Sequence, residues 1–275
     1  MSAQSIISAH LTIECQAVET SISKSKIDQL GDRLRKDNIT QDDLRLLDEY
    51  RRSFNNAYEV VVGTIRQQLG LEPTGRPAKS TTSITEKLQR ESIRLSQMQD
   101  ISGCRLVVSG IAEQEQVVAS IVEIFPGSLV VDRREKPSHG YRAVHVIALM
   151  DSRSVEIQIR TALQQLWAEL SEKLADLVDP AIKYGGGEEH FKQLLATGSE
   201  GIAEHESRES QVLDMQRSVS TMLSTAGLAE EIRSHIINLQ ERIASHQAEL
   251  EAHREKGIEL FRETVQVIEE NFRSS

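Results

Sequence analysis

Apolar side chains recur every three or four residues between positions 40 and 69, the spacing that places them along one face of a helix. They are Leu47, Tyr50, Phe54, Ala57, Val61, Ile65 and Leu69. Thr40 precedes this stripe as a candidate N-cap, and Gly70 follows it as a candidate helix end. The pattern predicts one helix over 40–69, and a fainter pattern of the same period runs through 1–36.

The middle of the chain changes to short runs of β-branched residues and alternating apolar and polar positions. The predicted strands are 101–109, 128–134, 141–149 and 154–160. The predicted helices around them are 84–95, 111–125 and 161–177. Residues 71–83 contain two prolines and a glycine without periodicity, so a loop is expected there. Closely spaced strands with helices before, between and after them indicate an α/β or α+β core.

From about residue 189 to the end, the pattern is helical and charged. A near-heptad apolar seam passes through Ile232, Ile236, Leu239, Ile243, Leu250, Phe261, Val265 and Phe272. His246 and His253 occupy seam positions where an apolar residue is usual. Such a seam is as typical of a helical hairpin packed on the core as of an oligomerisation arm, and both interpretations stay open.

Composition narrows the class of protein. The 275 residues are 39% hydrophobic and 27% charged, as in soluble proteins, and the net charge of −10 disfavours attraction to nucleic acid. Cys15 and Cys104 lie far apart and outside any metal-ligand spacing, so we expect buried thiols in a reducing compartment. Neither a signal-peptide pattern nor a membrane-length apolar run occurs, so a cytoplasmic location without membrane contact is expected.

Alternation along the strand 154–160 separates its side chains onto two faces. Glu156, Gln158 and Arg160 share the face opposite the apolar residues. An acid, an amide and a guanidinium suit a site that binds metal and phosphate, and they also occur on a charged outer sheet face. The strand alone therefore leaves both interpretations open.

Further polar groups lie near the other predicted strands and before one helix. Those near strand starts are Asp100, Arg105, Tyr141 and His145. Arg76, Lys79, Ser80 and Ser83 lie just before a predicted helix, whose N-terminus favours bound phosphate. Neither GxxxxGK[ST] nor GxGxxG occurs, so the chain has neither of these common phosphate-binding loops.

Four ordered segments contain these polar groups: GRPAKSTTSITEKL, DISGCR, KPSHGYRAVH and VEIQIRTALQQLWAELSEKL. On these segments the chain resembles the synthetase domain of the RelA/SpoT family over roughly residues 50–180. The family patterns are R-x-K-x-x-x-S-I-x-x-K-L, D-x-x-G-x-R, G-Y-R-S-x-H and E-x-Q-I-R-T followed by a Trp-containing helix. The resemblance implies a nucleotidyltransferase-like mixed β-sheet flanked by helices, with a C-terminal helical extension.

The activity that the resemblance implies is the transfer of pyrophosphate from ATP to the ribose 3′-hydroxyl of GDP or GTP, with Mg²⁺, making (p)ppGpp in the stringent response. With this resemblance, the expected domains are an N-terminal helical segment (1–49), a synthetase domain (50–184) and a C-terminal helical arm (185–275). The arm is expected to join copies into a homo-oligomer. No His-Asp pair precedes the motifs, so hydrolase activity is not expected.

The resemblance also implies roles for residues on the ATP side of the site. Asp100 and Glu156 would hold Mg²⁺, and Glu156 would take the proton from the acceptor hydroxyl. The triphosphate would be contacted by Lys79, Ser83 and Lys87. The adenine ring would be held between the guanidinium planes of Arg76 and Arg105.

On the acceptor side, Tyr141 would stack on the guanine base, with Lys136 and Arg142 near the acceptor phosphates. The residues expected to complete the site by positioning are His145, Gln158 and Arg160. Trp167 lies on the apolar face of its helix, so we expect it in the core instead.

The chain departs from the family pattern at three places. One extra residue separates Arg76 from Lys79, which makes the assignment of Arg76 less secure. His139 stands where many members have Asn, a change that could alter acceptor preference, and Ala143 replaces a serine.

Two other functions compete with alarmone synthesis. Some family members act as toxins that modify tRNA 3′ ends or make adenosine alarmones. Tyr141 would stack on guanine or adenine, so it does not distinguish these functions. The net charge weighs against tRNA, although the basic stretch 133–136 leaves that acceptor open. A non-catalytic nucleotide-binding regulator is disfavoured, because a binding module does not need both Asp100 and Glu156.

Overall fold

The computed structural model describes residues 22–224 and 230–272. The fainter helical pattern before residue 22 and the predicted thiol environment of Cys15 lie outside these residues. Cys104 is buried, as expected, and burial raises the pKa of its thiol to about 12. No helix in the described part of the chain is long and apolar enough to cross a membrane.

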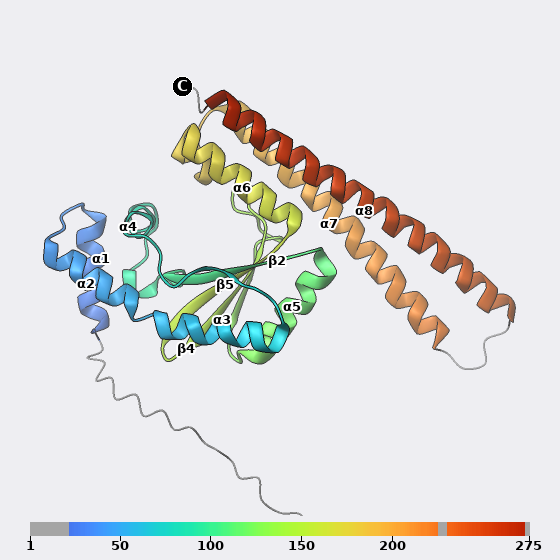
Figure 1. Cartoon of the computed structure of the whole chain (residues 1–275), viewed down its shortest axis with the longest axis horizontal. Coiled ribbons are helices and arrows are strands. Elements are labelled where there is room, and N and C mark those ends of the chain that lie inside the picture. Colours follow the sequence, from blue (N-terminus) through green and yellow to red (C-terminus); the bar gives the residue numbers. More distant parts are fainter. Residues whose placement is uncertain (1–21, 225–229, 273–275) are drawn as a thin grey trace, which may run out of the picture.

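A five-stranded sheet in the order β1-β2-β5-β4-β3 forms the centre of the molecule (Figure 1). The strands are β1 (Thr74–Arg76), β2 (Ser102–Val108), β3 (Leu129–Asp132), β4 (Val144–Met150) and β5 (Arg153–Thr161). β2 and β5 run parallel, whereas the other neighbouring pairs are antiparallel. The mixed sheet confirms the predicted α+β class, and the four predicted strands are present with slightly different bounds.

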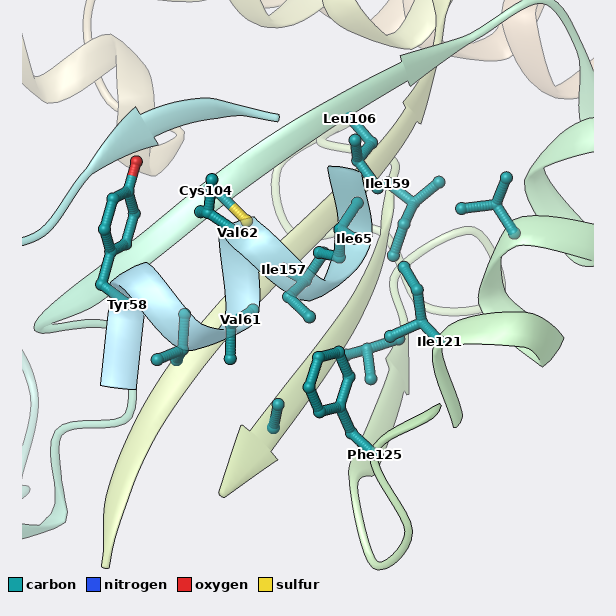
Figure 2. Packing of buried hydrophobic residues seen from close by; sticks show 14 of the residues in the cluster. Tyr58, Val61, Val62, Ile65, Cys104, Leu106, Ile121, Phe125, Ile157 and Ile159 are labelled. Carbon is teal, nitrogen blue, oxygen red and sulfur yellow. The ribbon is translucent and has the colours of Figure 1, made fainter. Parts of the chain in front are cut away.

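One face of the sheet is apolar and packs against two helices, α3 (Asn55–Leu69) and α5 (Ile111–Ile124). Figure 2 shows this packing, with Val61 and Ile65 of α3 and Ile121 of α5 against Ile157 and Ile159 of β5. The alternation of β5 places Ile157 and Ile159 here, so its polar side chains lie on the opposite face. The buried face thus leaves the other side of the sheet to polar groups.

A second apolar cluster lies beside the sheet and unites the N-terminal helices with the segment before β2. Its elements are α1 (Lys24–Arg35), α2 (Gln41–Arg52), α4 (Thr81–Arg90) and the short 3₁₀ helix η1 (Leu95–Gln97). Figure 1 shows α1, α2 and α4 grouped together at one end of the sheet. Leu30, Ile84 and Ile101 are fully buried in this cluster, which thereby fixes α4 and Asp100 relative to each other.

The helix predicted over 40–69 is two helices, because the chain turns between α2 and α3. The Ser53 hydroxyl donates to the Tyr50 carbonyl at 2.6 Å, and Phe54 packs edge-on to the Tyr50 ring in the second cluster. From Ala57 onward the side chains enter the sheet core instead. The apolar spacing continues through the turn, but its two halves face different clusters. Thr40 and Gly70 do cap the two outer ends, as predicted.

The predicted loop 71–83 and helix 84–95 also need correction. Strand β1 lies within the loop, where its three residues pair with β2. Helix α4 begins at Thr81, because the Ser80 hydroxyl caps it by accepting the Ser83 backbone N–H. It ends at Arg90, and Leu95 belongs to η1.

Residues after β5 form one short and two long helices. They are α6 (Ala162–Leu177), α7 (Glu189–Leu223) and α8 (Glu230–Phe272), with the 3₁₀ helix η2 (Pro180–Tyr184) between α6 and α7. In Figure 1, α7 and α8 form a long hairpin that extends beyond the sheet, and α6 lies between the hairpin and the sheet. The predicted C-terminal helical extension is therefore confirmed. Trp167 is buried against this hairpin and donates to the Leu195 carbonyl at 2.8 Å.

The seam of α8 is buried only in part. Ile236 and Ile243 pack against Val212 and Val219 of α7. Phe261 and Val265 pack toward α6 in a separate cluster. Ile232 is 51% exposed and Phe272 is 37% exposed. His253 stacks on His205 with ring centroids 6.1 Å apart. The buried seam residues therefore pack within the hairpin and against α6. The homo-oligomer stays a prediction.

The buried carboxylate of Asp43 offers a test of the N-terminal cluster. It accepts two hydrogen bonds from Arg33 and closes the capping box of α2 with Thr40. We expect Asp43→Asn to lower the free energy of unfolding by about 1–2 kcal/mol at pH 7 in urea denaturation. Asp42→Asn is the matched control, because Asp42 is exposed and pairs with exposed Arg45.

The free energy of unfolding should also depend on pH through Asp43. The Arg33 guanidinium lowers the pKa of Asp43 from 3.8 to about 2, so the folded state binds fewer protons than the unfolded state between these values. The stabilisation by Asp43 is complete above pH 3.8 and is lost as the pH falls through 2. Between pH 3.8 and 2, the free energy of unfolding of the wild type should fall more than that of Asp43→Asn. Equal falls would contradict the lowered pKa of Asp43.

Candidate active site

The strand register brings polar side chains from four strands to the face of the sheet opposite α3 and α5. Residues paired across neighbouring strands point to the same side, so each side chain below shares that face with Glu156. They are Arg76 of β1, Arg105 of β2, Gln158 and Arg160 of β5, and His145 of β4.

All of these side chains except His145 line a polar cavity of about 480 Å³. Its lining includes seven of the predicted site residues: Arg76, Lys79, Asp100, Arg105, Glu156, Gln158 and Arg160. The cavity is large enough to hold part of a nucleotide, and its lining supplies both cations and carboxylates.

Asp100 forms a charge cluster with two lysines at one side of the cavity. Its carboxylate lies 2.9 Å from the Lys79 ammonium and 2.8 Å from the Lys87 ammonium, which comes from α4. All three side chains are mostly buried. Burial favours the neutral acid, but the two ammonium groups outweigh it and hold the pKa of Asp100 below its usual value. The carboxylate is therefore ionised at neutral pH.

Glu156 is held by two hydrogen-bond partners. One of its oxygens lies 3.0 Å from His145 Nδ1, and the other accepts from Gln158 Nε2 at 2.8 Å. Burial raises the pKa of this carboxyl, but the interactions with His145 and Gln158 outweigh burial and hold the pKa below its usual value. Glu156 is an oriented, ionised carboxylate, the form that accepts a proton.

Arg160, which lines the cavity, connects Gln158 to Tyr141, which does not line it. Arg160 donates to the Tyr141 hydroxyl at 3.0 Å and to Gln158 Oε1 at 2.9 Å. Arginine only donates, so the Tyr141 hydroxyl is free to donate in turn to His145 Nε2, 2.9 Å away. His145 then donates from Nδ1 to Glu156. Burial raises the pKa of Tyr141, with Arg160 opposing it, so the phenol keeps its proton.

Arg76 and Arg105 lie diagonally on neighbouring strands, where Arg76 pairs with Gly103 and Arg105 with Thr74. The buried Nε of Arg105 has no hydrogen-bond partner within the described chain, as expected of a group that meets a ligand. Gly103 is required here, because a Cβ at that position would lie 2.8 Å from the Glu156 carbonyl oxygen. The glycine of the D-x-x-G-x-R segment thus lets two strands approach beneath the site.

Six predicted residues do not line the cavity, although three of them contact residues that do: Lys87 pairs with Asp100, His145 with Glu156 and Tyr141 with Arg160. Tyr141 reaches it only through Arg160 and His145, and the Ser83 hydroxyl bonds to Ser80 at 2.8 Å. Lys136 is exposed on the loop before β4. Arg142 points to α7, where it forms a buried ion pair with Glu206. The predicted contacts of these side chains with nucleotide stay predictions.

Glu172 of α6 lines the cavity but was not predicted. It follows Gln165 and Glu169 at helical spacing, which places all three on the polar side of α6. Gln165 accepts from Arg160 at 3.0 Å, so this helix face adjoins the strand face. The spacing could have indicated Glu172 once α6 was known to begin directly after β5.

Asp100 and Glu156 are the residues that suit a divalent cation. They line the same cavity, and the charge of Asp100 acts on Glu156. No group of three or more His, Cys, Asp or Glu side chains in the described residues has the arrangement of a complete metal site. Mg²⁺ commonly uses one or two carboxylates together with water and substrate phosphates, so the pair fits this ion when a nucleotide is present.

Comparison with known proteins identifies the region that holds this site. Residues 75–175 match the family model described as "Region found in RelA / SpoT proteins". An uncharacterized protein of Mycobacterium tuberculosis is 39% identical over 123 residues, which are 43% of this chain and 44% of that protein. The match therefore spans less than half the length of the curated relative.

Two solved structures are also similar. The small alarmone synthetase 1 from Bacillus subtilis has 26% identity and a TM-score of 0.45, covering 63% of this chain and 97% of that one. The same synthetase bound to its product pppGpp has 24% identity and a TM-score of 0.44, covering 65% and 100%.

The family match contains Arg76, Lys79, Asp100 and Glu156, which line the cavity, and it ends within α6. Residues 75–175 of this chain are therefore similar to the region found in RelA/SpoT proteins.

Proposed function

We propose that this protein is an alarmone synthetase, which transfers pyrophosphate from ATP to the 3′-hydroxyl of GDP or GTP. The observation that carries the proposal is one cavity in which Asp100 and Glu156 lie beside cationic groups for a polyphosphate, within a RelA/SpoT region. Phosphoryl-transfer enzymes work mainly by positioning and charge stabilisation, and the cavity has groups for both.

On the donor side, Lys79 and Lys87 bind the ATP phosphates. In the structure their ammonium groups neutralise Asp100, so both already face one anion within a mostly buried setting. A triphosphate attracts the same ammonium groups and leaves Asp100 available to Mg²⁺. Arg76 and Arg105 hold the adenine between their guanidinium planes.

On the acceptor side, Glu156 accepts the proton of the 3′-hydroxyl. The 3′-oxygen forms a bond to the β-phosphorus of ATP, the bond between that phosphorus and the α–β bridging oxygen breaks, and AMP leaves. His145 and Gln158 keep the Glu156 carboxylate oriented toward this proton. Asp100 and Glu156 would hold Mg²⁺, which would neutralise the phosphate charge.

A transfer assay tests the proposal. The purified protein is given γ-labelled ATP and Mg²⁺ with GMP, GDP, GTP, adenine nucleotides or bulk tRNA in separate reactions, and the products are resolved by thin-layer chromatography. We expect label on GDP or GTP. Label on tRNA or adenine nucleotides alone contradicts the guanine acceptor, and no transfer to any of them favours a non-catalytic regulator.

Tyr141→Ala tests the proposed stacking on the acceptor base. A lost stacking contact is worth about 1–3 kcal/mol, so the KM for the acceptor should rise about tenfold or more. The KM for ATP should change by less than about threefold, because Tyr141 does not line the cavity assigned to ATP. Steady-state kinetics with each substrate varied measures both values.

Tyr141→Phe is the matched control for this variant, because it keeps the ring and removes only the hydroxyl that joins Arg160 to His145. It should retain most acceptor affinity. Equal increases in both KM values for Tyr141→Ala would show that the ring has no specific part in acceptor binding.

A further inference from the structure

The loop between β3 and β4 carries Lys136 and Tyr141, two residues assigned above to the acceptor. An arginine stands at each end of this part of the loop, Arg134 before it and Arg142 after it. Neither arginine lines the cavity, and both have mostly buried side chains. A buried guanidinium needs acceptors for its N–H groups, so the partners of these arginines decide where the loop ends lie.

Arg142 finds its partner on the C-terminal hairpin. Its Nε donates to Glu206 Oε2 of α7 at 3.0 Å, and its Nη2 bonds to the same oxygen. The two side chains are 11% and 8% exposed. Such a pair is sensitive to loss of either member, because the remaining charge stays buried without a counter-charge.

Arg134 pairs directly with Asp132 of β3 at 2.7 Å, and it is also connected to the Glu206 carboxylate through two buried amides. Arg134 Nη1 donates to Gln114 Oε1 at 3.1 Å, and Gln114 Nε2 donates to Gln164 Oε1 at 2.9 Å. Gln164 Nε2 then donates to Glu206 Oε1 at 2.7 Å. Every bond in this series points toward the carboxylate. One oxygen of Glu206 therefore holds the end of the loop at Arg142, and the other is connected to the end at Arg134.

Tyr141 depends on this arrangement through its neighbour. Arg142 lies between the bridge at Tyr141 and the start of β4, and consecutive side chains of extended chain point in opposite directions. With the Arg142 side chain fixed on α7, the Tyr141 side chain is directed to Arg160 and His145. Anchoring one side chain thus orients the other.

We propose that Glu206 is a positioning residue for the acceptor side of the site, which makes the α7–α8 hairpin part of the machinery for acceptor binding. The inference rests on the proposed function for its kinetic consequence. Glu206 lies outside the RelA/SpoT match, which ends at residue 175, so this contribution comes from a part of the chain that the family model does not include.

Glu206→Gln is the direct test, since glutamine keeps the size but has only one acceptor oxygen for two donors. We expect the KM for GDP or GTP to rise about tenfold, with the KM for ATP changed less than about threefold. Amide hydrogen exchange followed by mass spectrometry should show residues 135–143 exchanging at least about tenfold faster. This second readout does not require catalysis.

Glu209→Gln is the matched control on the same helix. Glu209 accepts the Ile111 backbone N–H at 3.0 Å and so joins α7 to α5, without reaching the loop. It should leave both the acceptor KM and the exchange of residues 135–143 unchanged. Equal effects of the two variants would mean that Glu206 only stabilises the hairpin, which overturns the proposal.

A double-mutant cycle separates this role from direct binding of acceptor phosphate by Arg142. If Arg142 acts through Glu206, Arg142→Gln combined with Glu206→Gln should be no worse than Arg142→Gln alone. Additive losses would overturn the proposal. If Glu206→Gln is too unstable to study, Arg142→Gln breaks the same ion pair and replaces it in the exchange experiment.

The exchange result distinguishes failure of the inference from failure of the proposed function. A wild-type protein without transfer activity would refute the synthetase assignment, and exchange of residues 135–143 would still decide whether Glu206 holds the loop. An active wild type with unchanged exchange in both variants would refute only the role of Glu206.

Discussion

Glu156→Gln is expected to reduce kcat for pyrophosphate transfer about 10³-fold, the size of effect that loss of a general base produces. The carboxylate is ionised and oriented by His145 and Gln158, and glutamine cannot accept the proton of the acceptor hydroxyl. The fold should be preserved, because glutamine has nearly the same size. Steady-state rates, with circular dichroism as the check on folding, measure the outcome.

Glu113→Gln is a suitable control, since Glu113 bonds to Ser109 at the start of α5 and does not line the cavity. It should keep wild-type rates. A folded Glu156→Gln protein with a kcat within about tenfold of wild type would exclude Glu156 as the base.

Asp100→Asn is the second variant with a large expected effect. It removes the charge that Lys79 and Lys87 share and, in the proposed function, one of the two carboxylates that hold Mg²⁺. We expect kcat/KM for ATP to fall about 10³-fold, since both phosphate positioning and charge neutralisation are affected. The Mg²⁺ concentration for half-maximal activity should rise at least about tenfold.

Titration of Mg²⁺ at fixed ATP separates these two roles of Asp100. A slower enzyme with an unchanged Mg²⁺ requirement would contradict the metal assignment and leave Asp100 as a partner for the lysines alone. Asp28→Asn is the control, because Asp28 accepts the Ser96 backbone N–H outside the cavity and its loss should leave the Mg²⁺ requirement unchanged.

Features with a short period were predictable from the sequence. Alternation along β5 placed Glu156, Gln158 and Arg160 on one face because strand geometry alone decides it, and the structure bears this out. The turn between α2 and α3 was missed because no local pattern marks it. The spacing from Tyr50 through Phe54 to Ala57 stays helical, and only the tertiary clusters show that Phe54 and Ala57 belong to different cores.

The parts of the site that depend on distant residues could not be predicted from local pattern. Strand β1 has three residues and becomes visible only through its pairing with β2. Lys87 meets Asp100 because the second apolar cluster holds α4 beside the start of β2. Glu206 is 64 residues from Arg142, and no periodicity connects positions so far apart.

The most direct test of the synthetase assignment identifies what leaves ATP. The wild-type protein is incubated with α-labelled ATP, Mg²⁺ and GDP, and the adenine and guanine nucleotides formed are quantified. A synthetase should form AMP in amounts equal to a new guanine nucleotide that carries a pyrophosphate on its 3′-oxygen. Release of ADP with a singly phosphorylated acceptor, or ATP breakdown that does not depend on GDP, would contradict it.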